Sequence, residues 1–184
     1  MGDIDYDGEI KNVKPVVNKM NHDLNQTGLA YTRDRKTVYF AGNKYWKKKK
    51  KQNNPKNKKL QLFKASVNED GSWDNIEKLS FNKKGVDISH PVLSSDNKQL
   101  YFASDMKPSH GKTDIFVVDI REDGSYSEPR NLGTFVNTEG VETTPFISHD
   151  NILYFASDGH PGEGKLDVFA VEVYKEGTSE PYHL

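Results

Sequence analysis

Four aspartates are the residues of this sequence best placed for chemistry, because they flank two corresponding loops. They are Asp105 and Asp114 around one loop, and Asp158 and Asp167 around the other. Carboxylates placed in this way can bind Ca²⁺ together with main-chain carbonyls. Aspartates beside turns more often accept hydrogen bonds from backbone N–H groups. We expect this structural role, because Asn43 and Gln61 stand at the matching positions of an earlier copy.

Histidines and known catalytic signatures do not define an active site. Six histidines, all expected in loops, lack the spacing of metal ligands: His22, His90, His110, His149, His160 and His183. No GxSxG, P-loop or HExxH motif occurs. We therefore predict a protein that is not an enzyme and needs no cofactor, with Ca²⁺ as the one ion to consider. His110 and His160 occupy corresponding loops, where we expect surface hydrogen bonding.

A lysine-rich stretch is a candidate for binding a negatively charged polymer. Lys44–Lys59 contains nine lysines and no acidic residue. Such a stretch can meet nucleic acid, phospholipid headgroups or an acidic glycan, and Tyr45 and Trp46 could stack on a sugar or base. The alternative, which we favour, is a solvated loop. The candidate partner-binding residues are Tyr45, Trp46, Lys47, Lys48, Lys49, His110, Lys112, His160 and Lys165.

Composition narrows the class of protein. The 184 residues fit one domain, 1–184, and the absence of cysteine excludes disulfides and thiolate metal sites. No stretch approaches the ~18 consecutive apolar residues of a membrane span. The acidic start MGDIDYDGEI is not typical of a signal peptide. Nine tyrosines and nine phenylalanines favour strands over helices.

The elements that must position these residues repeat along the chain. Phe63, Phe116 and Phe169 are separated by 53 residues each, and the same step relates the turns that follow them. Each copy is predicted to form four short strands, expected in the second copy at 90–94, 99–104, 114–120 and 127–132. Turn-forming Asp, Asn and Gly residues separate these strands. Four-stranded units repeated at this interval are typical of propeller blades.

The predicted fold class is therefore all-β, with three four-stranded antiparallel blades of about 53 residues that form part of a β-propeller. The expected boundaries are a leader at 1–20, which includes an outer-strand segment, and blades at 21–79, 80–132 and 133–184. Three blades cannot close a ring, since propellers have about four to eight. Two explanations stay open: an excerpt of a larger propeller, or a homodimer that forms a six-bladed ring.

Packing between blades is predicted from a Tyr-Phe pair in the second strand of each copy, such as Tyr101-Phe102. Neighbouring side chains of a strand point to opposite faces, so each aromatic should contact a different neighbouring blade. The long loops join the second and third strands, and in a propeller they open on the same face as the blade-to-blade connections. Function tends to reside in long loops on a rigid scaffold, so we expect a partner site there.

The second and third copies resemble a known family. The stretch from Phe81 to Ala170, with HPVLSSDNKQLYFASD, TDIF, DGSYSEPRNLG and VNT, resembles the WD-like, TolB-type propeller repeats of OmpA-family envelope proteins of Gram-negative bacteria. Pro91, Ser94 and Asp96 match the pattern, as do Asp105, Asp114, Pro129, Asn131 and Gly133. The first copy departs from it, with Leu29-Ala30 at the proline position and Gln61 at the aspartate position.

This resemblance implies a non-catalytic, periplasmic module that binds proteins in an outer-membrane or peptidoglycan-associated assembly, such as type IX secretion or gliding machinery. Protein partners of the cell envelope are expected, with peptidoglycan or another anionic glycan as a further candidate and no nucleic acid. One alternative is a binder of glycan through the Lys44–Lys59 loop. Another is a glycan or peptide hydrolase on a propeller scaffold, which would need a convergent set of acid and base residues.

Overall fold

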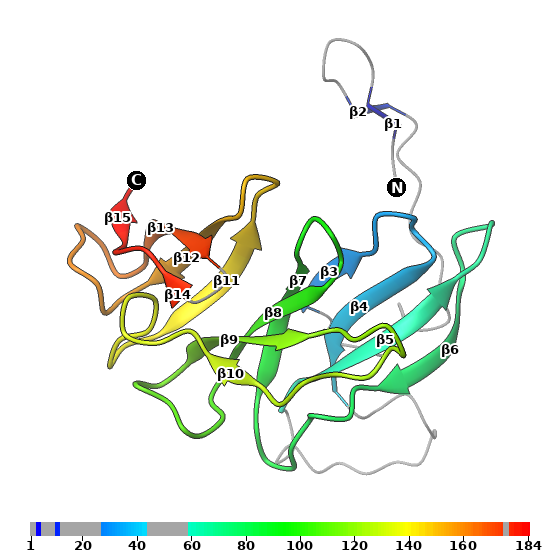
Figure 1. Cartoon of the computed structure of the whole chain (residues 1–184), viewed down its shortest axis with the longest axis horizontal. Coiled ribbons are helices and arrows are strands. Elements are labelled where there is room, and N and C mark those ends of the chain that lie inside the picture. Colours follow the sequence, from blue (N-terminus) through cyan, green and yellow to red (C-terminus); the bar gives the residue numbers. More distant parts are fainter. Residues whose placement is uncertain (1–2, 5–9, 12–26, 44–58, 175–176) are drawn as a thin grey trace.

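The computed structural model describes residues 3–4, 10–11, 27–43, 59–174 and 177–184, and these contain strands and no helix (Figure 1). Two short strands, β1 (Asp3–Ile4) and β2 (Ile10–Lys11), pair with each other. The other strands form three antiparallel sheets, which confirms the predicted all-β class. No helix that is long and apolar enough to cross a membrane occurs in the described ranges.

The first sheet has the order β3-β4-β5-β6. Its strands are β3 (Thr27–Tyr31), β4 (Thr37–Gly42), β5 (Gln61–Val67) and β6 (Trp73–Lys78). The turn between β3 and β4 is held by the Asp34 carboxylate, which accepts from the Thr32 hydroxyl at 2.7 Å and the Lys36 N–H at 3.0 Å. Short polar side chains therefore set this hairpin, as the turn-rich sequence predicts.

The second sheet repeats this arrangement with β7 (Ile88–Leu93), β8 (Gln99–Ser104), β9 (Asp114–Asp119) and β10 (Arg130–Asn131). The strand expected at 127–132 is thus reduced to two residues. The third sheet consists of β11 (Glu142–Ile147), β12 (Ile152–Ser157) and β13 (Asp167–Tyr174), and two short strands, β14 (Gly177–Thr178) and β15 (Tyr182–His183), share its outer edge.

A bulge interrupts the first strand of each sheet. The pairing register shifts between Ser89 and Val92 in β7, where His90 has a φ of 51°, and between Thr143 and Phe146 in β11. Pro91 and Pro145 lie at these two bulges, which spares each proline a place in the hydrogen-bonded ladder. His90 lies in β7, in agreement with the strand expected at 90–94, and His183 lies in β15. The expectation that all histidines occupy loops is wrong for both.

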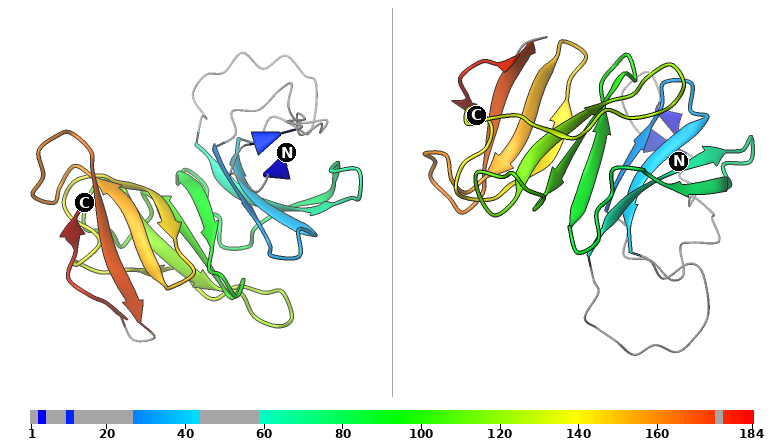
Figure 2. Two further views of the ribbon diagram at one scale, coloured as in Figure 1. Left: turned by 90° about the horizontal axis from the view of Figure 1, so that it is seen from above. Right: turned by 60° about the horizontal axis from the view of Figure 1, so that its bottom comes forward.

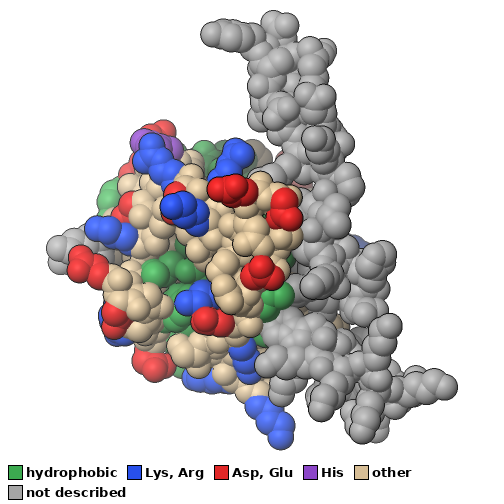
Figure 3. All heavy atoms as spheres, turned by 90° about the vertical axis from the view of Figure 1, so that its right-hand side faces the viewer, with side chains coloured by type: hydrophobic (Ala, Val, Ile, Leu, Met, Phe, Trp, Pro, Cys, Tyr) green, Lys and Arg blue, Asp and Glu red, His purple; other side chains and the backbone are tan. Residues whose placement is uncertain are grey.

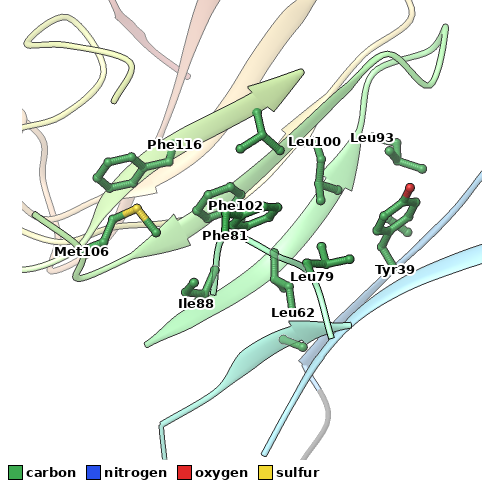
Figure 4. Packing of buried hydrophobic residues seen from close by; sticks show 13 residues of the cluster. Tyr39, Leu62, Leu79, Phe81, Ile88, Leu93, Leu100, Phe102, Met106 and Phe116 are labelled. Carbon is green, nitrogen blue, oxygen red and sulfur yellow. The ribbon is translucent and has the colours of Figure 1, made fainter. Parts of the chain in front are cut away.

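The three sheets stand side by side, each packed against the next (Figure 2). Phe102, on one face of β8, packs in a cluster with residues of the first sheet such as Tyr39 and Leu62 (Figure 4). Tyr101, on the other face, packs with Leu153 and residues near it in the third sheet. The prediction that the paired aromatics contact different neighbours is confirmed for the second sheet.

Both central aromatics are almost completely buried, with Phe102 at 0% and Tyr101 at 1% exposure. Burial of one such side chain contributes roughly 1.5–3 kcal/mol. The Phe102 ring stacks on Phe81 and Phe116 at centroid distances of 5.3 and 6.0 Å. A single strand therefore anchors two separate hydrophobic clusters, one on each of its faces.

The two end sheets differ in the faces that they turn away from the second sheet. On the first sheet, Val38, Phe40, Phe63, Ala65 and Trp73 form a third buried cluster. Around this sheet, Figure 3 shows basic and acidic side chains interspersed on the surface, with only small apolar areas. On the third sheet, Phe146 is 58% and Val168 48% exposed. The third sheet therefore presents an apolar face to solvent.

The sheets fall inside the sequence ranges 21–79, 80–132 and 133–184 proposed for the blades. The outer-strand segment expected within 1–20 lies outside the described residues, except for Lys11 in β2. Most of the lysine-rich stretch, residues 44–58, also lies outside them, and with it the candidates Tyr45, Trp46, Lys47, Lys48 and Lys49.

Candidate partner-binding face

The loops expected to bind a partner lie at one end of the sheets. The strand order places the β8–β9 connection (105–113) and the β12–β13 connection (158–166) at the same end as the links between sheets (79–87 and 132–141). Contacts between these segments fix their backbones: the Lys112 N–H donates to the Gly140 carbonyl at 2.9 Å, and Thr113 forms a parallel bridge with Val141. Loop and linker therefore form one connected surface.

Asp114, the first residue of β9, fixes the backbone of the β8–β9 loop. Its carboxylate is fully buried and accepts from the N–H groups of His110 at 2.7 Å and Gly111 at 3.1 Å. The Asn131 amide on β10 donates to the same carboxylate at 2.6 Å. Three donors thus compensate the burial of one carboxylate, and both of its oxygens are occupied by protein groups.

Asparagines in the links between sheets bind the third strand of the preceding sheet. The Asn137 Oδ1 accepts from the Ile115 N–H at 2.7 Å, and its Nδ2 donates to the Ile115 carbonyl at 3.0 Å. Asn82 makes the same pair of bonds with Leu62, at 2.9 and 2.8 Å. We call this arrangement the asparagine clamp. It fixes the direction in which each link leaves its sheet.

Asp105 joins the first and second sheets. Its Oδ1 accepts from the Asp87 N–H at 2.7 Å, and its Oδ2 accepts from the Lys59 ammonium. The hydrogen bond to Asp105 is the main reason why the pKa of Lys59 is raised, against a smaller opposing effect of burial. The Lys59 Nζ also lies 3.8 Å from the Asp87 Oδ2. The two sheets are therefore linked by charge at this end of the molecule.

Asp158 and Asp167 occupy the corresponding places in the third sheet. The Asp158 Oδ1 accepts from the Val141 N–H at 2.6 Å. The Asp167 Oδ2 accepts from the Gly164 N–H at 2.9 Å, and its Oδ1 lies 3.7 Å from the His183 Nε2. His183 takes the register position of Asn131, since these residues pair with Phe169 and Phe116 respectively.

Glu142 is a buried acceptor that sequence reasoning missed. It is fully buried on β11, where its carboxylate accepts from the Thr138 hydroxyl at 2.6 Å, the Thr138 N–H at 2.9 Å and the Ser157 hydroxyl at 2.7 Å. Its place in the register is that of Ile88, which pairs with Ser104 as Glu142 pairs with Ser157. The sequence carries no clear signal of this role, because the 53-residue step aligns Glu142 with Ser89 and not with Ile88.

The loop residues proposed as contacts do not all have the same environment. His110, Lys112 and Lys165 are exposed, whereas His160 is half-buried. The His160 ring packs against Phe155 and Phe169, at centroid distances of 5.7 and 5.0 Å, and its Nε2 lies 3.0 Å from the Val136 carbonyl, an acceptor. His160 is therefore a packing residue, whereas His110 is exposed.

Nothing in the described part of the chain groups three or more His, Cys, Asp or Glu side chains in a way that could hold a metal ion. The four aspartates proposed from the sequence are spread over two loops, and each accepts at least one backbone N–H. Their geometry suits the support of loops. What this face offers to a partner is a hydrogen-bonded backbone surface with exposed side chains of both charges, such as Lys112 and Glu163.

Comparisons with known proteins show the fold. No family model and no curated relative matches the chain. Solved structures do match it: putative TolB from Agrobacterium tumefaciens (15% identity, TM-score 0.57) over 84% of this chain and 48% of that one, and the periplasmic gluconolactonase PpgL from Pseudomonas aeruginosa (17%, 0.54) over 90% and 43%. A puromycin-hydrolyzing peptidase from Mycobacterium tuberculosis (16%, 0.54) matches over 92% and 25%.

The chain therefore has the fold of a β-propeller of the TolB-like type. It spans less than half the length of each of these neighbours, and it contains three sheets of such a propeller. The neighbours include both TolB and hydrolases, so the fold leaves activity open.

Proposed function

We propose that this chain is a non-catalytic propeller module that binds a protein partner of the cell envelope through the face made by the β8–β9 and β12–β13 loops. The observation that carries the proposal is that hydrogen bonds from buried side chains fix the backbone of this face. Asp114 holds the β8–β9 loop with both oxygens, and the asparagine clamp holds the link beside it. Loops held in this way present a fixed surface, which lowers the entropic cost of binding.

The two loops of this face carry side chains of both charges. Lys107, Lys112 and Lys165 are exposed on them, and so are Asp158 and Glu163. Exposed charges steer association and form a polar rim around a contact. We therefore propose a partner surface whose charges complement this mixed pattern.

The periplasm is the compartment that we propose, in line with the neighbour described as a periplasmic gluconolactonase. The resemblance of the repeats to those of OmpA-family envelope proteins supports the further proposal of a role in an outer-membrane or peptidoglycan-associated assembly. Type IX secretion or gliding machinery is the assembly of this kind that we propose.

Site-specific photo-crosslinking in the periplasm tests this function. A photoreactive residue at Lys112 should crosslink to a defined protein, and the same residue at Asp123, in a turn at the opposite end of the sheets, should not. The crosslink should be lost when Lys107 and Lys165 are both changed to Glu. Equal crosslinking at both positions, or a crosslink that survives the double change, would contradict the proposal.

Two binding assays separate the alternatives. Retention of the full chain on purified peptidoglycan or lipopolysaccharide, compared with a chain that lacks 44–58, tests a glycan site in the lysine-rich stretch. Unchanged retention excludes that site. Hydrolysis of peptide or lactone substrates by the purified chain, abolished by a single substitution of an acid or base on the loop face, would instead establish an enzyme.

A further inference from the structure

The third sheet has an open position where the other two sheets are covered. Leu62, Ile115 and Val168 are equivalent, since they pair with Ala41, Ala103 and Ala156 in their sheets. Leu62 and Ile115 are fully buried by the sheet that follows each of them, whereas Val168 is 48% exposed. Phe146 and Leu184 are exposed by 58% and 62%. We call this surface the open face.

The main chain at Val168 also matches the positions that the asparagine clamp binds in the other two sheets. The carbonyls of Leu62, Ile115 and Val168 accept from Leu79, Leu132 and Leu184 at 3.1, 3.2 and 3.1 Å, so the outer edges match. At Leu62 and Ile115, an asparagine side chain also bonds the N–H and the carbonyl of that residue. No asparagine amide bonds to Val168 within the residues that the structure describes.

We propose that the open face binds one further sheet of this same repeat, supplied with the link that precedes it. The asparagine of that link bonds the Val168 N–H and carbonyl, as Asn82 and Asn137 do for their partners. The Leu-x-Phe residues of the sheet, like Leu100 and Phe102, cover Val168. This surface is distinct from the loop face assigned above to a protein partner.

The structure favours such a sheet over a second copy of the chain. The pattern requires a face of the Phe102 kind, and in the first sheet the corresponding residues Val38 and Phe40 are fully buried. The faces of this kind on the second and third sheets are covered by their neighbours. A second copy therefore has no exposed face of the matching kind to offer.

An extended chain tests the proposal. Leu184 holds the register position of Leu79, so a second copy of Ser80–Leu132 can be joined directly after Leu184. It brings its own link with Asn82 and its Phe102 face. Hydrogen exchange at the Val168 N–H should slow at least about tenfold relative to the original chain, because an exposed group becomes clamped. Asn82→Ala in the added copy is the matched control and should abolish most of that protection.

Results that would contradict the proposal can be stated for the extended chain and for the original chain. An extended chain in which Val168 gains no protection contradicts the proposal, because the open face should hold a sheet built from this repeat. In the original chain, Val168→Glu should leave the free energy of unfolding nearly unchanged, while Ile115→Glu should abolish folding. A concentration-dependent dimer in analytical ultracentrifugation that protects Val168 would assign the face to a second copy and overturn the proposal.

Discussion

Asn137, in the link between the second and third sheets, bonds both main-chain groups of Ile115 on β9, 22 positions earlier, with an N–H···Oδ1 distance of 2.7 Å. Both residues are buried. The pair closes the joint between the second and third sheets without a strand-to-strand ladder at that point. Equivalent bonds between Asn82 and Leu62 close the preceding joint.

Replacement of Asn137 should therefore be costly. Asn137→Ala leaves the buried N–H of Ile115 without its acceptor, which should lower the free energy of unfolding by about 1–3 kcal/mol. Asn137→Asp retains an acceptor but buries a carboxylate, so it should destabilise as well. Urea denaturation measures both, with Thr134→Ala, at an exposed position in the same link, as control. A loss no larger than the control's would show that the clamp does not contribute.

Asp114 should control the order of the β8–β9 loop. Asp114→Ala removes the acceptor for the N–H groups of His110 and Gly111 and for the Asn131 amide, so hydrogen exchange at both loop amides should accelerate at least tenfold. Stability should also fall by about 2 kcal/mol or more. The matched control is Asp123→Ala, in an exposed turn. Loop amides that keep their protection would refute this assignment.

The ion pair between Lys59 and Asp105 should contribute little but depend clearly on pH and salt. Lys59→Met should cost about 0.5 kcal/mol at low ionic strength, because the pair is partly exposed. The pKa of Lys59 is raised in the folded state, so its contribution is complete below 10.5 and is lost as pH rises through the folded pKa.

The measurement is the difference in unfolding free energy between the original chain and Lys59→Met, at low and at about 1 M salt. The difference should shrink in high salt. Asp105→Ala should cost more than Lys59→Met, because the Asp87 N–H also loses its acceptor. A larger effect of the lysine change than of the aspartate change would contradict this picture.

Acid should weaken the turn between β7 and β8. The pKa of Asp96 is lowered, first by the hydrogen bond from the Ser94 hydroxyl and then by the bond from the Lys98 N–H. A lowered pKa contributes stability above the ordinary value of 3.8 and loses it as pH falls through the folded pKa. Ser94→Ala should therefore cost about 1 kcal/mol at neutral pH.

The difference in unfolding free energy between Ser94→Ala and the original chain should become smaller as the pH falls below 3.8 and Asp96 becomes protonated. It should not close, because the Ser94 hydroxyl also accepts from the Gln99 N–H at 2.9 Å. Chemical denaturation at neutral and acidic pH, with Ser95→Ala at an exposed position of the same turn as the surface control, gives the comparison. A gap that is constant with pH would exclude Asp96 as its source.

The sequence was sufficient for the fold because the repeat and the alternation of side chains are local signals. The step from Phe63 to Phe116 places equivalent strands, and the order Tyr101-Phe102 decides which faces meet. These predictions need no knowledge of which side chains approach each other across the chain.

The supporting contacts of the loop face were less accessible from the sequence. The asparagine clamp joins Asn137 to a residue that becomes its neighbour only after the sheets assemble, and Glu142 looks like one of many charged residues until its register with Ser157 is known. His160 was grouped with His110 from its loop, but the ring turns inward onto Phe155. Such outcomes depend on backbone paths that periodicity does not specify.

The position of Tyr101 and Phe102 has a consequence for how the molecule comes apart. The two clusters that hold the sheets together have no residue in common, yet these neighbours on β8 belong to one cluster each. Stability should therefore pass between units by nearest-neighbour coupling, as in a linear array. Unfolding of one end sheet can leave the other two sheets packed together. A distortion of β8, in contrast, weakens the packing on both of its faces.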